Sequence, residues 1–199
     1  MLAAAFVLQL FVPDALETAG LSGAAVREGR AYTLLTHMFV HAGLVHLGFN
    51  SFALLGVAIV VAERMPPTRA SWARLLAFFL VCGLAGAALF LALHPDGGLP
   101  MVGASGAICG LWGAAARLHG AAEGVHPLRS RPVRRQMRAF AVSNLVLFAL
   151  LWALARALGS EGGLAWQAHL GGFATGLLAA PLLVRTRDAR AARNWDRAH

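Results

Sequence analysis

Five long windows of this sequence contain no Asp, Glu, Lys or Arg. They are residues 42–62, 75–93, 97–116, 139–155 and 164–184. As a helix rising about 1.5 Å per residue, each window is about long enough to cross a hydrocarbon core of about 30 Å. The chain is 58% hydrophobic and only 13% charged, whereas soluble domains carry about 25% charged residues. The pattern excludes a disordered chain, a nucleic-acid-binding tail and an ordinary soluble enzyme. It predicts an all-α, polytopic membrane protein.

We expect six membrane spans in one transmembrane domain that covers residues 1–199. The first apolar run has neither the basic start nor the cleavage site of a signal peptide, so it is counted as a span. The short tail 185–199 is rich in arginine. The expected spans are about residues 1–18, 36–62, 72–93, 103–119, 139–158 and 164–185.

The arginines predict how the spans are oriented. All 17 basic residues are Arg, of which 14 follow the second, fourth and sixth spans and 3 lie in the alternate segments. Because basic residues concentrate on the cytoplasmic side, both termini are predicted to be cytoplasmic. The loops at 94–102 and 159–163 then face outwards. The same rule accounts for the formal net charge of +8, so we expect the lipid bilayer, and not nucleic acid, as the environment of this charge.

Polar side chains inside the predicted spans are the candidates for function, because such groups are costly in lipid. His46 and Asn50 are four residues apart and share one helix face. Ser105 begins the fourth span, and His169 lies about five residues into the sixth. Counted from the outer side, these groups lie at depths that allow them to line one outward-facing cavity.

Glycines indicate which spans touch. Small residues allow helix backbones to approach closely in lipid, so we expect the fourth and sixth spans to pack tightly and to bring Ser105 within reach of His169. A purely structural role for these glycines remains open. The glycines are Gly106, Gly110 and Gly113 in the fourth span and Gly172 and Gly176 in the sixth.

This set of residues predicts acyl-transfer chemistry. A serine needs an adjacent base, and His169 can accept the proton of Ser105 and later return it to the leaving amine. The first turn of a helix offers unpaired N–H groups to an oxyanion. The windows contain no Asp or Glu, so we infer a Ser–His dyad. Asp96 and Glu161, in the outer loops, are weak candidates for a third member.

At this point the sequence resembles the rhomboid family of intramembrane serine proteases. The resemblance covers about residues 33–185 and implies a six-helix bundle that cleaves transmembrane segments of other proteins without a metal or a cofactor. It implies that Ser105 is the nucleophile and His169 the base, that His46 and Asn50 line the oxyanion site, and that His41 lies at the mouth of the cavity. Glu63 resembles the acidic residue of the family after the second span. The motifs are His41-x4-His46-x3-Asn50, Gly103-Ala104-Ser105-Gly106 and Ala168-His169-x2-Gly172-x3-Gly176.

Two positions differ from the family pattern. Tyr32-Thr33 stands where many members have Trp-Arg before the second span, which leaves the anchoring of that loop open. Cys109 stands where some members place an aromatic residue against the catalytic histidine. Trp112 and Trp166 are candidates to orient His169 instead. Like Cys82, Cys109 is expected to be a packed thiol rather than half of a disulfide.

Two other functions compete with proteolysis. A catalytically inactive relative would bind membrane-protein clients without cleaving them. A haem or metal protein would use His37, His41, His46 and His169, of which the first two have i, i+4 ligand spacing. We favour a protease that acts on transmembrane protein substrates and needs no metal. Its small size and Arg/Ala-rich composition point to a bacterial inner (plasma) membrane.

Overall fold

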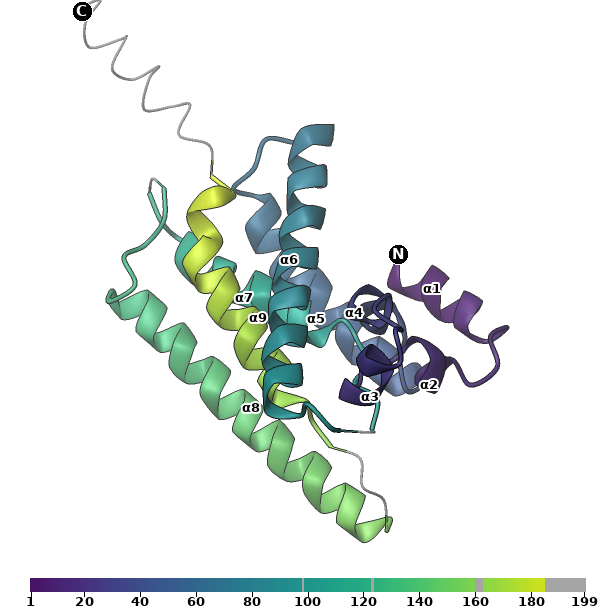
Figure 1. Ribbon diagram of the computed structural model, residues 1–199. Coiled ribbons are helices and arrows are strands. Elements are labelled where there is room, and N and C mark those ends of the chain that lie inside the picture. Colours follow the sequence, from purple (N-terminus) through teal and green to yellow (C-terminus); the bar gives the residue numbers. More distant parts are fainter. Residues whose placement is uncertain (98, 123, 160–162, 185–199) are drawn as a thin grey trace, which may run out of the picture.

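All regular secondary structure that the computed structural model describes is helical, apart from an isolated antiparallel bridge between Leu21 and Met101. The described residues are 1–97, 99–122, 124–159 and 163–184, so the arginine-rich tail 185–199 lies outside them. In chain order the helices are α1 (Leu2–Gln9), α2 (Ala15–Ala19), α3 (Gly23–Arg27), α4 (Thr33–Thr36), η1 (His37–Phe39), α5 (Leu44–Ala62), α6 (Arg69–Leu93), α7 (Ser105–Leu118), α8 (Arg131–Ala157), α9 (Trp166–Ala179) and η2 (Ala180–Leu182) (Figure 1).

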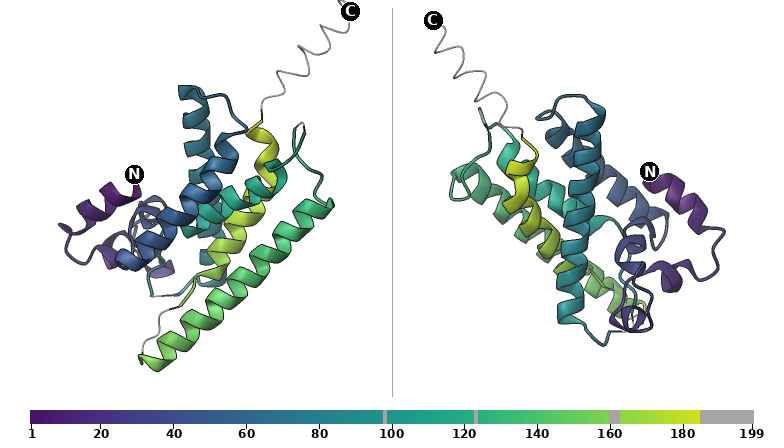
Figure 2. Two further views of the ribbon diagram at one scale, coloured as in Figure 1. Left: turned by 180° about the vertical axis from the view of Figure 1, so that it is seen from behind. Right: turned by 45° about the horizontal axis from the view of Figure 1, so that its top comes forward.

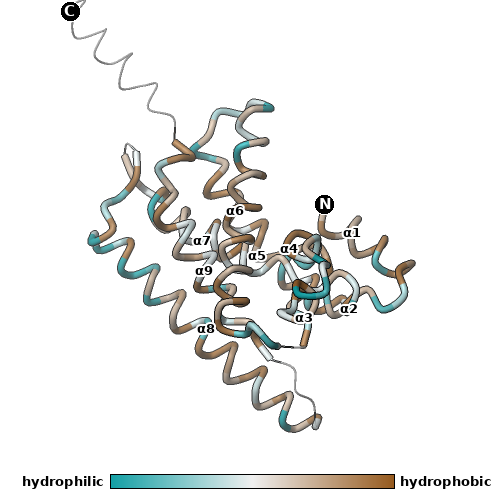
Figure 3. The backbone as a smooth tube through the Cα atoms, viewed as in Figure 1, coloured by the Kyte–Doolittle hydropathy of each residue, from teal (hydrophilic) through white to brown (hydrophobic). Residues whose placement is uncertain are grey.

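Three helices are long and apolar enough to cross a membrane. They are α5, α6 and α8, with 19, 25 and 27 residues. Only 11%, 33% and 6% of their most hydrophobic windows are buried inside the protein, so most of their apolar side chains face outwards. Along α8, the first turns are hydrophilic and the rest is mainly hydrophobic (Figure 3). Exposed apolar surface of this extent is stable only in lipid, so the chain is an integral membrane protein.

Two shorter helices, α7 and α9, form the centre of the bundle. Each has 14 residues, and α7 contacts α5, α6, α8 and α9 (Figures 1 and 2). The glycines lie in the closest contacts: a Cβ atom on Gly172 would lie 1.9 Å from the carbonyl oxygen of Gly106, and one on Gly176 would lie 1.7 Å from that of Gly110. The expected packing of the fourth and sixth predicted spans is therefore present, although both helices are shorter than predicted.

The predicted first span, 1–18, is wrong as a single helix. The eight residues of α1 end at Gln9, and at about 1.5 Å per residue they reach about 12 Å, well short of a bilayer core. Proline fixes its own backbone, restricts the residue before it and lacks an N–H donor. Pro13 and the positive φ of 48° at Asp14 separate α1 from α2.

The predicted second span, 36–62, begins too early. The helix starts at Leu44, and residues 37–39 form the short 3-10 helix η1. Gly43 separates the two with φ of 148°, a conformation that side-chain-bearing residues rarely adopt. Consequently, His41 lies in a loop and not on the helix that carries His46.

Candidate active site

Ser105 is positioned by a glycine turn and by its place as the first residue of α7. Gly103 has a φ of 106°, and its N–H donates a hydrogen bond of 2.8 Å to the carbonyl oxygen of His37. This bond ties the turn to η1, and Ala104 then leads directly into the helix. The Ser105 side chain is half-buried, so its hydroxyl lies at the edge of the packed core and not in its interior.

His169 meets this hydroxyl from the first turn of α9. Its Nε2 atom lies 2.7 Å from Ser105 Oγ, within hydrogen-bond distance. The side chain is 5% exposed. Glycines make room for the neighbouring backbone: a Cβ on Gly86 of α6 would lie 2.6 Å from the carbonyl oxygen of Ala168, and one on Gly106 would lie 3.2 Å from it. Close packing of α6, α7 and α9 therefore holds the serine and the histidine together.

The second ring nitrogen of His169 contacts Asn144 of α8, a residue that our sequence reasoning did not single out. The distance from Nδ1 to Asn144 Oδ1 is 2.6 Å. Asn144 Nδ2 in turn donates a hydrogen bond of 2.9 Å to the carbonyl oxygen of Phe140. The chain Ser105–His169–Asn144 thus crosses three helices.

The sequence contained a sign of Asn144's role that reasoning from membrane depth did not detect. It is a polar side chain in the charge-free window 139–155, which is reason enough to suspect function. However, it lies 13 residues before the end of α8, whereas His169 lies three residues after the start of α9. The two meet because α8 extends well past the level at which α9 begins (Figure 1).

The other candidates for orienting His169 lie elsewhere. Trp112 donates its indole N–H to Gln136 Oε1 at 3.0 Å and meets Phe140 and Phe173 edge-on. Trp166 is 41% exposed. Asp96 forms an exposed ion pair with Arg27 at 3.1 Å, and Glu161 lies outside the described residues. Within the described residues, the recorded hydrogen bond and ring contacts of Trp112 go to Gln136, Phe140 and Phe173, and the recorded partner of His169 Nδ1 is Asn144.

His46 and Asn50 lie over the turn that precedes the serine. A Cβ on Gly103 would lie 2.7 Å from both Cε1 and Nε2 of His46, and 3.8 Å from Nδ2 of Asn50. Asn50 is 5% exposed, and its Nδ2 donates to the carbonyl oxygen of His46 at 2.9 Å. Both side chains therefore border the approach to the start of α7.

His41 packs against His46 without exposing its ring. The ring centroids are 5.2 Å apart in an edge-on arrangement, and His41 is fully buried. Neither of its ring nitrogens has a hydrogen-bond partner among the described residues. Burial, reinforced by the neighbouring His46, lowers the pKa of His41 to about 4, so the ring is neutral near pH 7.

The backbone of His41 is held by Gln9 of α1. Gln9 Nε2 donates to the His41 carbonyl oxygen at 2.8 Å, and the His41 N–H donates to Gln9 Oε1 at 2.9 Å. Here the side-chain amide pairs with the backbone as a neighbouring strand would. This contact links α1 to the histidine loop beside the candidate site.

The segment before α5, where Tyr32-Thr33 stands in place of the Trp-Arg that the resemblance implies, is anchored by other side chains. Arg30 donates to the carbonyl oxygen of Glu17 at 2.8 Å, and the Tyr32 hydroxyl donates to that of Thr18 at 3.1 Å. Thr36 adds a bond of 2.8 Å to the carbonyl oxygen of Ala19. The carbonyl oxygens at the end of α2 therefore accept hydrogen bonds from three side chains of this segment.

No group of three or more His, Cys, Asp or Glu side chains within the described ranges could hold a metal ion. Cys82 and Cys109 are both buried and free.

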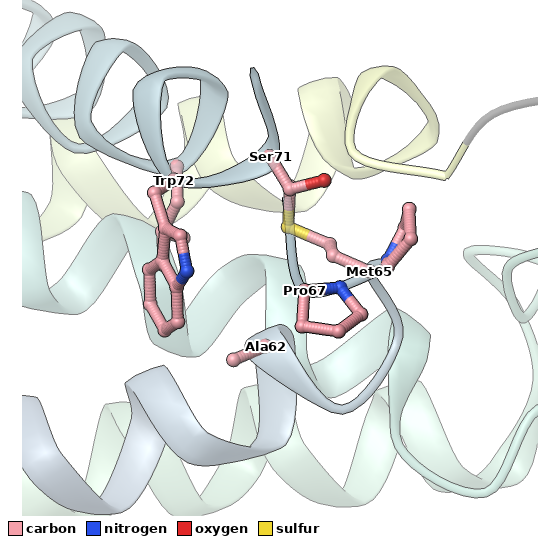
Figure 4. A pocket seen from close by; sticks show the side chains of 7 residues that line it. Ala62, Met65, Pro67, Ser71 and Trp72 are labelled. Carbon is pink, nitrogen blue, oxygen red and sulfur yellow. The ribbon is translucent and has the colours of Figure 1, made fainter. Parts of the chain in front are cut away.

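A small pocket lies at the turn between α5 and α6 (Figure 4). It begins at Ala62, 16 residues along α5 from His46, or about 24 Å away, so it is separate from Ser105. Its lining residues are Ala62, Met65, Pro66, Pro67, Ser71, Trp72 and Leu75.

Fold and site together define an integral membrane protein in which a serine hydroxyl and a buried histidine meet at the start of a central helix. The family model of the Rhomboid domain matches residues 28–186. The chain therefore belongs to the rhomboid family.

Individual relatives agree with this assignment. The chain is 37% identical over 89 residues to the Rhomboid protease GluP of Bacillus subtilis (strain 168), a match that covers 45% of this chain and 16% of that protein. It is 30% identical over 164 residues to RHOMBOID-like protein 4 of Arabidopsis thaliana, covering 80% of this chain and 36% of the relative. RHOMBOID-like protein 5 of the same plant is 27% identical over 103 residues, covering 52% of this chain and 32% of the relative. These matches cover between about one sixth and about one third of the relatives' own lengths.

Proposed function

We propose that this protein is an intramembrane serine endopeptidase that hydrolyses peptide bonds in or near the transmembrane segments of other membrane proteins. The observation that carries the proposal is the 2.7 Å contact between Ser105 Oγ and His169 Nε2. A half-buried hydroxyl at a helix start, in contact with a nearly buried imidazole, fits a nucleophile with its base. The expected family roles of both residues support this assignment.

In the proposed reaction, Ser105 Oγ attacks the carbonyl carbon of the scissile peptide bond while its proton moves to His169 Nε2. The carbonyl oxygen becomes an oxyanion in the tetrahedral intermediate. The C–N bond then breaks, and His169 returns the proton to the leaving amine. A water molecule, deprotonated by the same nitrogen, hydrolyses the acyl-serine and restores the hydroxyl.

The oxyanion would be stabilised at the start of α7. The N–H groups of a first helical turn have no partner within the helix, and the helix dipole favours negative charge there. His46 and Asn50 border the same region, next to the Gly103 turn, and could donate hydrogen bonds from their side chains. We assign no metal or cofactor to this reaction.

Orientation and substrate entry follow as further parts of the proposal. The bias in arginine supports cytoplasmic termini and a site that opens to the outer side of a bacterial inner membrane. A substrate segment would approach beside α8, as the family resemblance implies. This helix leaves its apolar side chains largely exposed, which suits an entry route from the lipid.

The alternative is a catalytically inactive rhomboid-like protein that binds membrane-protein clients. Inactive relatives in the family suggest this alternative, and Cys109, in place of an aromatic residue after the nucleophile, adds slight support to it. Cys109 carries less weight because Asn144 meets the histidine from a different helix at 2.6 Å. The 2.7 Å distance between Ser105 Oγ and His169 Nε2 supports the protease, which we favour.

The direct test compares wild type with Ser105→Ala and His169→Ala in liposomes that contain a single-span substrate. Wild type should cleave the substrate and be labelled by a fluorophosphonate probe, and both variants should lose cleavage. Ser143→Ala is the matched control, since it removes an exposed hydroxyl from α8. Cleavage that survives in Ser105→Ala would refute the proposal, and client capture without any cleavage by wild type would favour the inactive alternative.

A further inference from the structure

We propose that Asn144 is a positioning residue for the reaction. In this role its side-chain carbonyl holds His169 in the tautomer that can accept the proton of Ser105. The inference rests on the proposed protease function. It extends the expected Ser–His dyad to a hydrogen-bonded Ser–His–Asn set from α7, α9 and α8, in which Asn144 positions the histidine. It is carried by the geometry around the imidazole.

The two contacts of the His169 ring require a particular proton arrangement. To act as a base towards Ser105, Nε2 must carry a lone pair, so in the neutral ring the hydrogen must sit on Nδ1. Nδ1 lies 2.6 Å from Asn144 Oδ1, which can accept that hydrogen. The opposite tautomer would direct an N–H towards the serine hydroxyl and leave Nδ1 without a donor to bind.

Asn144 is itself prevented from presenting the wrong end of its amide. Its Nδ2 donates to the carbonyl oxygen of Phe140, one turn earlier on α8, at 2.9 Å. A flipped amide would set its oxygen against that carbonyl oxygen and its NH2 group against His169 Nδ1. Only the orientation with Oδ1 towards the histidine satisfies both neighbours.

The aromatic packing holds the amide and the imidazole at a fixed separation. Phe140 stacks on Phe173 of α9, with ring centroids 3.9 Å apart and an interplanar angle of 14°. Phe140 precedes Asn144 by one turn of α8, and Phe173 follows His169 by one turn of α9. The stack therefore fixes the two helices in register at the level of the hydrogen bond.

An uncharged acceptor predicts a moderate effect. An amide can select the tautomer and direct the ring, but it lacks the negative charge with which a carboxylate stabilises an imidazolium. General-base catalysis contributes about 100- to 10,000-fold to a rate, and a misdirected base loses part of that contribution. We expect loss of the Asn144 acceptor to lower kcat about 10- to 100-fold and to leave KM unchanged.

The test measures kcat and KM for cleavage of a single-span substrate in liposomes by Asn144→Leu and Asn144→Asp. Asn144→Leu keeps the side-chain size but removes the acceptor, so kcat should fall. Asn144→Asp keeps an acceptor oxygen for His169 Nδ1 but loses the donor to the Phe140 carbonyl oxygen, so its kcat should fall less than that of Asn144→Leu. Ser143→Ala, on the adjacent exposed position, should match wild type and controls for changes to α8.

A second measurement reports the tautomer directly. In nitrogen-15 NMR spectra of labelled wild type, with the His169 signals assigned by comparison with His169→Ala, Nδ1 should carry the proton in the neutral ring. A neutral wild-type ring protonated on Nε2 overturns the inference, and this reading does not depend on whether any Asn144 variant folds. Wild-type kcat in a folded Asn144→Leu protein also overturns it. Those results leave the protease assignment standing if Ser105→Ala is inactive, whereas an active Ser105→Ala protein refutes the protease assignment itself.

Discussion

A methyl group added to Gly172 should separate the nucleophile from its base. The new Cβ would lie 1.9 Å from the carbonyl oxygen of Gly106 and 2.8 Å from its carbonyl carbon. Both are backbone atoms of α7 beside Ser105, so no side-chain rotation can relieve the contact. Raising the shorter distance from 1.9 Å to 3.0 Å, below which real Cβ contacts are essentially never seen, requires α7 and α9 to move apart by about 1.1 Å.

Such a movement is large compared with the tolerance of the site. If α7 and α9 separate as rigid bodies along the 2.7 Å contact between Ser105 and His169, that distance becomes about 3.8 Å, which is no longer a hydrogen bond. Misplacement of a reacting group by about 1 Å can cost about 100-fold in rate. Overpacking of a tight core also costs about 1–3 kcal/mol of stability. Gly172→Ala should therefore lower kcat about 100-fold and lower the unfolding midpoint.

Gly56→Ala provides the matched control for this variant. Gly56 lies on α5, and a Cβ there would meet no heavy atom within 4 Å. Alanine is favoured over glycine in a helix by about 0.5–1 kcal/mol, so the control should be as active as wild type and at least as stable. Cleavage of a single-span substrate and thermal unfolding are measured on both variants in the same lipid. If Gly172→Ala cleaves within about threefold of wild type, the close-packing argument is wrong.

Three more predictions test the surroundings of the site. Gly103→Ala should lower kcat at least about 10-fold, because a Cβ at φ of 106° would be strained and would lie 2.7 Å from the His46 ring; unchanged kinetics in the cleavage assay would contradict this. Gln9→Ala should reduce the free energy of unfolding by about 1–3 kcal/mol, because two hydrogen bonds to the His41 backbone are lost; chemical denaturation measures the change, and an unaltered midpoint would show that the contact is dispensable. The two cysteines are buried and free, so a thiol reagent should modify neither in the folded protein and both after denaturation, and fast labelling of native protein would argue against their burial.

The sequence predicted that α5, α6 and α8 are long apolar helices, because each contains a long window free of charges, although α8 begins at Arg131 and not at the predicted residue 139. It predicted the span 1–18 poorly, because the hydropathy of residues 1–12 conceals how short the helix is before Pro13. The start of the second span was also misjudged, since Gly43 ends a separate segment instead of continuing a helix. In both cases a local backbone constraint decided the boundary, and hydropathy does not register such constraints.

The candidate site divides in a similar way. Ser105 and His169 were expected to meet, because the glycine spacing and their similar depth can be derived from the sequence. The two side chains lie in contact, and their catalytic roles remain predictions. The orienting group for His169 was not foreseen. Identifying Asn144 requires the offset of α8 relative to α9 along the helix axes. That offset depends on side-chain packing such as the Phe140–Phe173 stack.

The order of the three contributing helices along the chain has a consequence for biogenesis. Ser105 is made with α7, Asn144 with α8, and His169, the proposed proton acceptor, with α9. Because chains are synthesised from the N-terminus, a growing polypeptide holds this serine without its proposed base until α9 has been made. On the proposed mechanism, proteolytic competence is therefore acquired only after α9 has been made and packed, and a shorter nascent chain cannot attack neighbouring nascent proteins.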